Sequence, residues 1–244
     1  MRNSDRFLNA FRAIEEHLRK LTSKPKIPFW MLVNARAKAS DLTICEYRND
    51  LTQFAELRNA IVHMDGGKER VIAEPNDYAV GKIERIRDLI LQPPGIGEIY
   101  HRPVLTCKPH DSIMEVARAM ANWGYSQMPV VEDGRLHGLI TTHTIARWVG
   151  TSSHHTMESL REARVSEALL FAEESDNYRF IGKHKSVYDV IEVFGDYGRV
   201  GRVLDAVLVT EQGKPGEEII GIITTADLPK AYELIRLEEP SENS

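Results

Sequence analysis

The run Gly138-Leu139-Ile140-Thr141-Thr142 returns 83 positions later as Gly221-Ile222-Ile223-Thr224-Thr225. Each copy closes a segment that begins with an amphipathic helix, at Ser112–Met120 in the first copy and Ser186–Phe194 in the second. These helices are 74 positions apart, so the second copy carries nine extra residues between its helix and its glycine-containing strand. A repeated unit usually buries its apolar face against its neighbour. The sequence therefore predicts a tandem repeat.

Both copies have the same expected order of elements: strand, helix, strand, strand, helix. In the first copy, Gln127–Val131 and Leu136–Thr141 are predicted to form a hairpin around Asp133-Gly134, a dipeptide that favours a tight turn. We expect the extra residues of the second copy to lie in two loops, at 195–202 and 212–218. The second part of the chain is thus expected to belong to the α+β class.

These features together resemble the CBS domain, and the two copies resemble the CBS-domain pair known as a Bateman module. The resemblance rests on the run Met128–Val131, the Asp-Gly turn and the Gly-x-x-Thr strand, which coincide in order and spacing. It covers residues 102–236, with repeats at about 102–150 and 165–236. The resemblance implies two sheets packed against each other, with clefts for adenine nucleotides.

The residue types agree with a nucleotide cleft. A carboxylate can accept hydrogen bonds from both hydroxyls of a ribose, and a threonine hydroxyl at the start of a helix suits a phosphate. The pattern Gly-x-x-Thr-x-x-Asp of the family is complete in the second repeat, as Gly221, Thr224 and Asp227. The first repeat has Thr144 at the aspartate position. We therefore expect one site for ATP, ADP or AMP on the second repeat, and a weakened or empty one on the first.

Basic residues near the second repeat are the expected phosphate partners. Arg199 and Arg202 fall in the predicted inserted loop, and Lys183 and Lys185 precede the helix. The alternative is that Asp227 only caps the last helix while the basic side chains are solvated.

Residues 1–92 are expected to form a bundle of four helices. The first helix has an apolar stripe at helical spacing, made of Phe7, Phe11, Ile14, Leu18 and Leu21. Three more helices are expected at about 29–39, at 42–63 and after Pro75, and a linker is expected at 93–101. In the second helix, Trp30 is a candidate for the core.

The third of these helices places Arg58 in an apolar stripe, where a guanidinium must be paired or must face a partner or a cavity. With Asn59 and His63, Arg58 forms a motif that resembles the Arg-x4–6-His motif of HEPN domains. HEPN domains are small helical bundles that usually dimerise, and many are metal-independent ribonucleases. The resemblance implies that His63 acts as acid or base, that Arg58 holds the scissile phosphate and that Asn59 orients one of them.

The spacing within this motif favours a site shared by two chains. Five helical residues turn about 500°, which would leave Arg58 and His63 some 140° apart on one helix. A composite site across a homodimer would bring them together. The alternative is a bundle without catalytic activity, which only dimerises, contacts RNA or docks a partner.

Composition agrees with a folded globular protein, with 42% hydrophobic and 27% charged residues. Residues 1–92 carry a net charge of +3 and the rest −8, a distribution that would suit contact between the N-terminal part and a polyanion. Because no apolar run approaches the roughly 20 residues of a membrane span and the N-terminus lacks a signal-peptide pattern, we expect a cytoplasmic protein. Cys45 and Cys107 lack metal-ligand spacing, so no metal is predicted and both thiols are expected to be packing residues. The tail 237–244 is expected to be disordered.

The sequence thus suggests a CBS pair that senses an adenine nucleotide and controls a HEPN-like helical domain, itself a possible RNA endonuclease. Nucleotide at Asp227 would shift the packing of the repeats, and the linker would pass that shift to the helical dimer. The alternative is a non-enzymatic nucleotide-binding module whose helical domain only dimerises or docks a partner.

Overall fold

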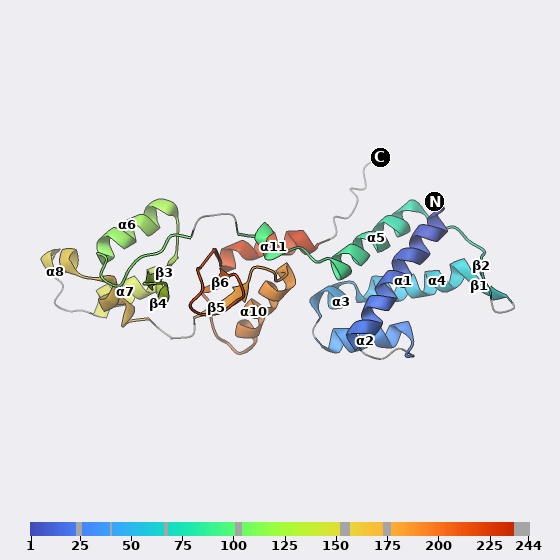
Figure 1. Cartoon of the computed structure of the whole chain (residues 1–244), viewed down its shortest axis with the longest axis horizontal. Coiled ribbons are helices and arrows are strands. Elements are labelled where there is room, and N and C mark those ends of the chain that lie inside the picture. Colours follow the sequence, from blue (N-terminus) through green and yellow to red (C-terminus); the bar gives the residue numbers. More distant parts are fainter. Residues whose placement is uncertain are drawn as a thin grey trace. The chain divides into compact units, whose positions relative to one another are not determined.

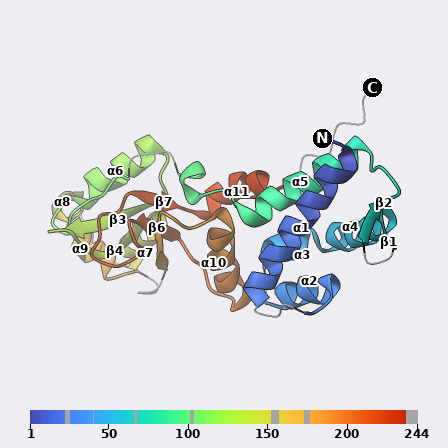
Figure 2. The same ribbon diagram turned by 45° about the vertical axis from the view of Figure 1, so that its right-hand side comes forward.

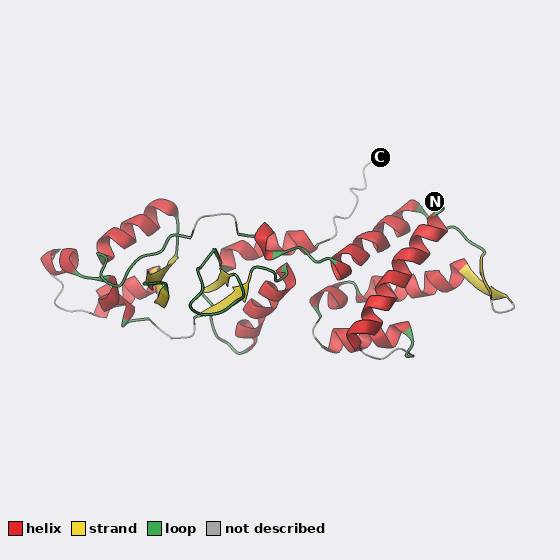
Figure 3. Ribbon diagram, in the orientation of Figure 1, coloured by secondary structure: helices red, strands yellow, loops and turns green. Residues whose placement is uncertain are grey.

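The computed structural model describes residues 1–22, 26–39, 41–65, 68–100, 104–151, 157–172 and 177–236. They form two compact units: unit 1 is Met1–Pro94 with Leu234–Ser244, and unit 2 is Gly95–Glu233. Figure 1 labels the elements of each unit, and Figure 3 distinguishes their helices from their strands. Among these residues, no helix is both long and apolar enough to cross a membrane. The expected disordered tail, 237–244, lies outside the described residues.

Unit 1 is mainly helical. Its α-helices are α1 (Asn3–Thr22), α2 (Phe29–Lys38), α3 (Leu42–Glu46), α4 (Arg48–Ile61) and α5 (Asp77–Leu91). The helix expected at 42–63 is therefore two helices. Asp41 caps α3 by accepting a hydrogen bond from the backbone N–H of Ile44 at 3.2 Å. At Tyr47 the backbone departs from helical geometry (φ −97°, ψ 16°), and this residue separates α3 from α4.

A short hairpin follows α4, and the prediction that this helix reaches His63 is wrong. Strand β1 (Val62–Asp65) pairs antiparallel with β2 (Lys68–Val71), and His63 lies opposite Arg70. The backbone N–H of Ile72 donates to the carbonyl of Ile61 at 2.8 Å, which extends the pairing. The β-branched pairs Ile61-Val62 and Val71-Ile72 stand at the two ends of this segment, and such residues favour an extended backbone over a helix.

The core of unit 1 forms where α1 lies alongside α5 (Figures 1 and 2). Of the predicted stripe on α1, all but the last residue are buried; Leu21 is 46% exposed. Ile83 and Ile86 of α5 are fully buried in the same cluster. The core prediction for Trp30 is wrong, since its side chain is 54% exposed.

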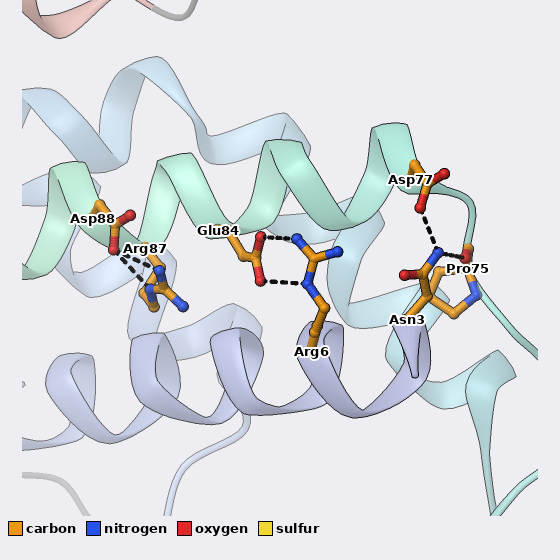
Figure 4. A network of polar contacts seen from close by, with 7 residues as sticks. All are labelled: Asn3, Arg6, Pro75, Asp77, Glu84, Arg87 and Asp88. Carbon is orange, nitrogen blue, oxygen red and sulfur yellow. Dashed lines mark hydrogen bonds and ion pairs between the residues drawn. The ribbon is translucent and has the colours of Figure 1, made fainter. Parts of the chain in front are cut away.

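Polar contacts fix the same two helices to each other, as Figure 4 shows. The Arg6 guanidinium donates to both carboxylate oxygens of Glu84, at 3.0 and 2.6 Å. At the end of the helix pair, Asn3 donates to Asp77 at 2.8 Å. Such a bidentate ion pair fixes the register of the two helices as well as the distance between them.

Unit 2 contains the two repeats. The first comprises α6 (Ile113–Trp123), β3 (Gln127–Glu132), β4 (Arg135–Thr141) and α7 (Thr142–Thr151), followed by α8 (Met157–Glu162) and α9 (Val165–Leu169). The second comprises β5 (Tyr178–Gly182), α10 (Val187–Arg199), β6 (Ala206–Thr210), β7 (Gly221–Ile223), the 3-10 turn η2 (Thr225–Asp227) and α11 (Leu228–Ile235). The predicted strand–helix–strand–strand–helix order is thus complete in the second repeat.

The two repeats share one sheet topology. In the second, β5 is parallel to β6, and β6 is antiparallel to β7. In the first, β3 is antiparallel to β4, but the expected opening strand is reduced to a single parallel bridge between Cys107 and Val130. The turn at Asp133 and Gly134 is confirmed, because both residues adopt positive φ (51° and 73°).

The extra residues of the second repeat lie on both sides of β6. In the first repeat Gly138 pairs with Val130, and in the second Gly221 pairs with Val209. The two hairpins can therefore be aligned with these glycines at the same position. The prediction of a loop over 195–202 is only partly right, because α10 continues to Arg199. The longer loop after β6 is held by Glu217, whose carboxylate accepts bonds from Thr210 Oγ1 and the Gln212 N–H, each at 2.8 Å.

Apolar side chains from both repeats form one cluster. Leu139 of β4 packs with Ala206 and Leu208 of β6, and all three are buried. The segment expected to be a linker also packs within unit 2. Its Ile96 is fully buried and donates a backbone hydrogen bond to the carbonyl of Lys185 at 3.1 Å.

Candidate ligand-binding site

A cavity of about 390 Å³ lies in unit 2 beside Asp227. Its lining comes from three parts of the chain. The segment before the first repeat contributes Ile99 and Tyr100, the first repeat contributes Leu105, Gly124–Gln127 and Pro129, and the second contributes Ile222, Thr224, Ala226, Asp227 and Lys230. Because the cavity takes residues from both repeats, a ligand bound in it would contact both.

Asp227 is fixed at the start of α11 by Thr224. One carboxylate oxygen, Oδ2, accepts from the backbone N–H of Thr224 at 2.8 Å and from its hydroxyl at 3.0 Å. The Thr224 hydroxyl in turn accepts from the N–H of Ala226 at 3.2 Å. Within the described part of the chain, Oδ1 of Asp227 has no hydrogen-bond partner. The carboxylate is therefore oriented while one of its oxygens stays available to a ligand.

The remaining walls of this cavity are largely apolar and aromatic. Tyr100 and Tyr125 are half-buried and contribute two rings to the lining. Tyr125 is stacked on exposed Trp123, with ring centroids 6.4 Å apart and planes inclined by 20°. Aromatic faces beside a fixed carboxylate offer one surface for a planar base and one acceptor for hydroxyl groups.

Gly221 does not line the cavity but gives room to a residue that does. A Cβ placed on Gly221 would lie 2.6 Å from a ring carbon of Tyr100. Only glycine allows the ring to approach β7 so closely.

The structure does not bring the predicted basic residues together with Asp227. Lys183 forms an ion pair with Glu211 at 2.9 Å, and this hydrogen bond raises the pKa of Lys183. Arg199 is an exposed residue of α10 that pairs with Asp196. Neither is among the residues that line the described cavities. Arg202 lines a different cavity. Lys185 Nζ lies 3.2 Å from Asp189.

Sequence reasoning missed Tyr100, Tyr125 and Lys230, which all line the Asp227 cavity. Lys230 could have been found, because it follows Asp227 by three positions and so shares its helix face. The two tyrosines come from a segment read as a linker and from the other repeat, so spacing within the second repeat contains no sign of them.

A second cavity, of about 600 Å³, is lined by the equivalent part of the first repeat. Thr141 and Thr144 are both buried, and their hydroxyl oxygens are 3.0 Å apart. The backbone N–H of Thr144 also donates to Thr141 Oγ1 at 3.0 Å. Thr144 thus bonds back to its own repeat at the position where Asp227 offers an oxygen.

In unit 1, the predicted catalytic residues divide between two elements. Arg58 and Asn59 are near the end of α4, and Arg58 Nη1 lies 3.3 Å from Asn59 Oδ1. His63 is on β1, so the helical geometry that separates it from Arg58 by 140° does not apply. The side chain of His63 lies outside the described part of the structure.

No group of three or more His, Cys, Asp or Glu residues that could hold a metal is found in the described ranges. Cys107 is buried, and burial raises the pKa of its thiol to about 12. Cys45 is exposed, so its assignment as a packing residue is wrong.

Comparison with known proteins agrees with the architecture of unit 2. Residues 96–151 match the CBS domain family, so the chain contains a CBS domain. Protein MJ1232 of Methanocaldococcus jannaschii is 27% identical over 135 residues, which cover 55% of this chain and 38% of MJ1232. The present chain therefore corresponds to well under half of that relative.

Solved structures of CBS proteins are similar at low identity. MJ1225 of Methanocaldococcus jannaschii, proposed as an archaeal homolog of g-AMPK, is 22% identical with a TM-score of 0.45, over 67% of this chain and 55% of that one. The CBS domain pair of MJ0100, in complex with 5′-methylthioadenosine and S-adenosyl-L-methionine, is 19% identical with a TM-score of 0.43, over 58% and 97%. ATU1752 of Agrobacterium tumefaciens is 23% identical with a TM-score of 0.40, over 54% and 90%.

Proposed function

We propose that unit 2 is a CBS pair that binds one adenine nucleotide in the Asp227 cavity and acts as a regulatory module. The observation that carries this proposal is the Asp227 carboxylate, held through Oδ2 by Thr224 while Oδ1 remains available. A carboxylate that is held in this way and has a free oxygen can accept charge-assisted hydrogen bonds from both hydroxyls of a ribose.

The rest of the lining supplies the other contacts that such a ligand needs. The rings of Tyr100 and Tyr125 give a flat apolar surface for adenine. Lys230, one turn after Asp227, provides a positive charge for a phosphate. Of the residues predicted from sequence, Thr224 and Asp227 keep direct roles in this proposal and Gly221 an indirect one. Lys183, Arg199 and Arg202 are not among the residues that line this cavity.

A regulatory role is supported by the fact that residues from both repeats line the Asp227 cavity. A ligand that contacts both repeats stabilises the packing that offers all of those contacts at once. It can shift the equilibrium only by its difference in affinity between two arrangements. Leu139, Ala206 and Leu208 form the apolar layer between the repeats whose packing such a ligand would bias.

Calorimetric titration of the full chain with adenosine, AMP, ADP and ATP tests this function. We expect one bound nucleoside per chain, and an affinity at least tenfold lower for Asp227→Asn, because a neutral amide cannot accept both ribose hydroxyls with the strength of a carboxylate. Asp196→Asn, which alters an exposed carboxylate of α10, is the matched control and should bind as the wild type does. Equal adenosine affinity in Asp227→Asn and wild type would refute the proposal.

For unit 1 we propose, as a second candidate, metal-independent cleavage of RNA by a HEPN-like homodimer. The contact between Arg58 and Asn59 supports this grouping, because it holds two of the three motif residues together. Incubating end-labelled RNA with wild type and His63→Ala tests it. Cleavage by the wild type and none by the variant would support an enzyme. If neither cuts RNA while adenosine still binds, the helical unit only dimerises or docks a partner.

A further inference from the structure

The second cavity of unit 2 differs in chemistry from the Asp227 cavity, although equivalent positions build both. Three of its lining residues precede three residues of the Asp227 cavity by 83 positions each: Thr141 corresponds to Thr224, Thr144 to Asp227 and Arg147 to Lys230. The two cavities can therefore be compared residue by residue.

The features that suit a nucleoside are absent from this lining. Thr144 replaces the aspartate, and its hydroxyl bonds to Thr141. The residues that line the cavity in the described structure include no Phe, Tyr or Trp side chain. The carboxylate of Asp205 does line it, but Oδ2 accepts a hydrogen bond of 2.6 Å from the Asn177 amide. The cavity thus offers neither a flat apolar wall for a base nor an acceptor at the place equivalent to Asp227.

The features that suit phosphate oxygens are retained and strengthened. Arg147 comes from α7 in the first repeat, and Arg202 follows α10 in the second. The Arg202 guanidinium lies over the ring of Tyr197, 5.5 Å from its centroid, and its backbone N–H donates to the Tyr197 carbonyl at 2.9 Å. The described lining thus contains two guanidinium groups, together with the ring of His143 and the carboxylate of Asp205. Guanidinium groups match the geometry of phosphate oxygens.

We propose that this second cavity binds a phosphate-type oxyanion without a nucleoside, such as pyrophosphate or a short polyphosphate. An anion with two or more phosphoryl groups can engage Arg147 from one repeat and Arg202 from the other. The cavity volume of about 600 Å³ leaves room for such an ion. The proposal is independent of the adenine nucleotide, because its residues belong to a different cavity.

Calorimetric titration of the full chain with sodium pyrophosphate, and separately with adenosine, tests the proposal. We expect the wild type to bind pyrophosphate, and the double variant Arg147→Gln/Arg202→Gln to bind it at least tenfold more weakly with unchanged adenosine affinity. Lys230→Gln is the matched control, because it removes the equivalent cation from the Asp227 cavity, and it should leave pyrophosphate binding unchanged. The three basic side chains are exposed, so the variants should melt at the wild-type temperature.

Three outcomes would overturn the assignment. One is no heat of binding at millimolar pyrophosphate. Another is a loss of pyrophosphate affinity in Lys230→Gln that equals or exceeds the loss in the arginine variant. The third is displacement of pyrophosphate by adenosine, which would place the anion in the Asp227 cavity. Failure of adenosine to bind, with pyrophosphate binding still dependent on the two arginines, would instead refute only the nucleotide proposal.

Discussion

Gly221 on β7 lies against the ring of Tyr100, so close that a Cβ on the glycine would be 2.6 Å from ring carbon Cδ2. This contact connects the segment before the first repeat to the last strand of the second. It also places the Tyr100 ring in the wall of the Asp227 cavity.

Gly221→Ala should therefore destabilise unit 2 and weaken adenosine binding together. Forcing a methyl group into a packed site costs about 1–3 kcal/mol, and the displaced ring would no longer fit the ligand. Denaturant titration and calorimetry measure the two effects. The control is Gly195→Ala in α10, where the added Cβ meets nothing within 4 Å, and this change should be neutral or stabilising. Unchanged adenosine affinity in Gly221→Ala would contradict a role for Tyr100.

Asp189, in the first turn of α10, should make the free energy of unfolding depend on pH. Burial acts to raise the pKa of Asp189. Hydrogen bonds from the hydroxyl and backbone N–H of Ser186, at 2.6 and 2.8 Å, and the ion pair with Lys185 together outweigh it, so the pKa is lowered in the folded state. The stabilisation is therefore present above the unfolded-state pKa of 3.8 and is lost as the pH falls through the lower, folded-state pKa.

Melting curves of wild type and Asp189→Asn between pH 7 and pH 3 test this prediction. A helix cap of this kind contributes about 1 kcal/mol, so the variant should melt about 2–4 °C lower at pH 7. The difference should shrink on acidification below pH 4. Asp196→Asn, an exposed position in the same helix, should follow the wild type throughout. A difference between Asp189→Asn and wild type that stays constant with pH would show that the charge of Asp189 contributes nothing.

The two cysteines should react at very different rates. Cys45 is exposed, whereas Cys107 is buried with its pKa raised to about 12 by burial and by the nearby charge of Asp111. The thiolate is the reactive form, so a disulfide reagent at pH 8 should label one thiol per native chain and two in urea. Cys45→Ser should abolish labelling of the native protein, and Cys107→Ser should leave it unchanged. Rapid labelling of both native thiols would contradict the packing around Cys107.

Thr144→Asp tests whether one substitution accounts for the difference between the cavities. We expect the new carboxylate to weaken pyrophosphate binding by repulsion. Adenosine should still bind once per chain, because the described lining of the second cavity has no counterpart of the Tyr100 and Tyr125 rings. The number of adenosine molecules bound per chain, measured by calorimetry, tests this expectation. Two adenosines per chain would show that the aspartate alone determines nucleoside binding.

Sequence patterns predicted the elements with strong periodicity and missed those that depend on contacts across the chain. The stripe on α1 and the hairpin at Asp133-Gly134 follow local rules, and the structure has both. Trp30 is a large apolar residue of the kind usually found in a core. The sequence of a short helix, however, does not indicate which of its faces packs against the rest of the protein. For His63, the pair Gly66-Gly67 suits a turn between two strands as well as the end of a helix, and the pairing of β1 with β2 decides between the two.

In the candidate site too, residues that contact each other locally could be predicted, whereas those that depend on contacts across the chain could not. Thr224 and Asp227 could be predicted because they contact each other within one turn of helix. The basic residues could not be placed, since side chains before β6 can lie at either cavity and spacing does not distinguish them. Arg202 lines the second cavity, and Lys183 pairs with Glu211.

The apolar layer of Leu139, Ala206 and Leu208 belongs to both repeats, so neither repeat covers this face of its sheet by itself. A protein made of one such repeat would have to pair with a copy of itself, and a symmetric pair has two identical cavities. Joining the repeats in one chain removes that constraint. Only then can one cavity have a carboxylate at Asp227 while its counterpart has Thr144 at the equivalent position. On the two proposals made above, a single molecule would in this way respond to two chemically different signals.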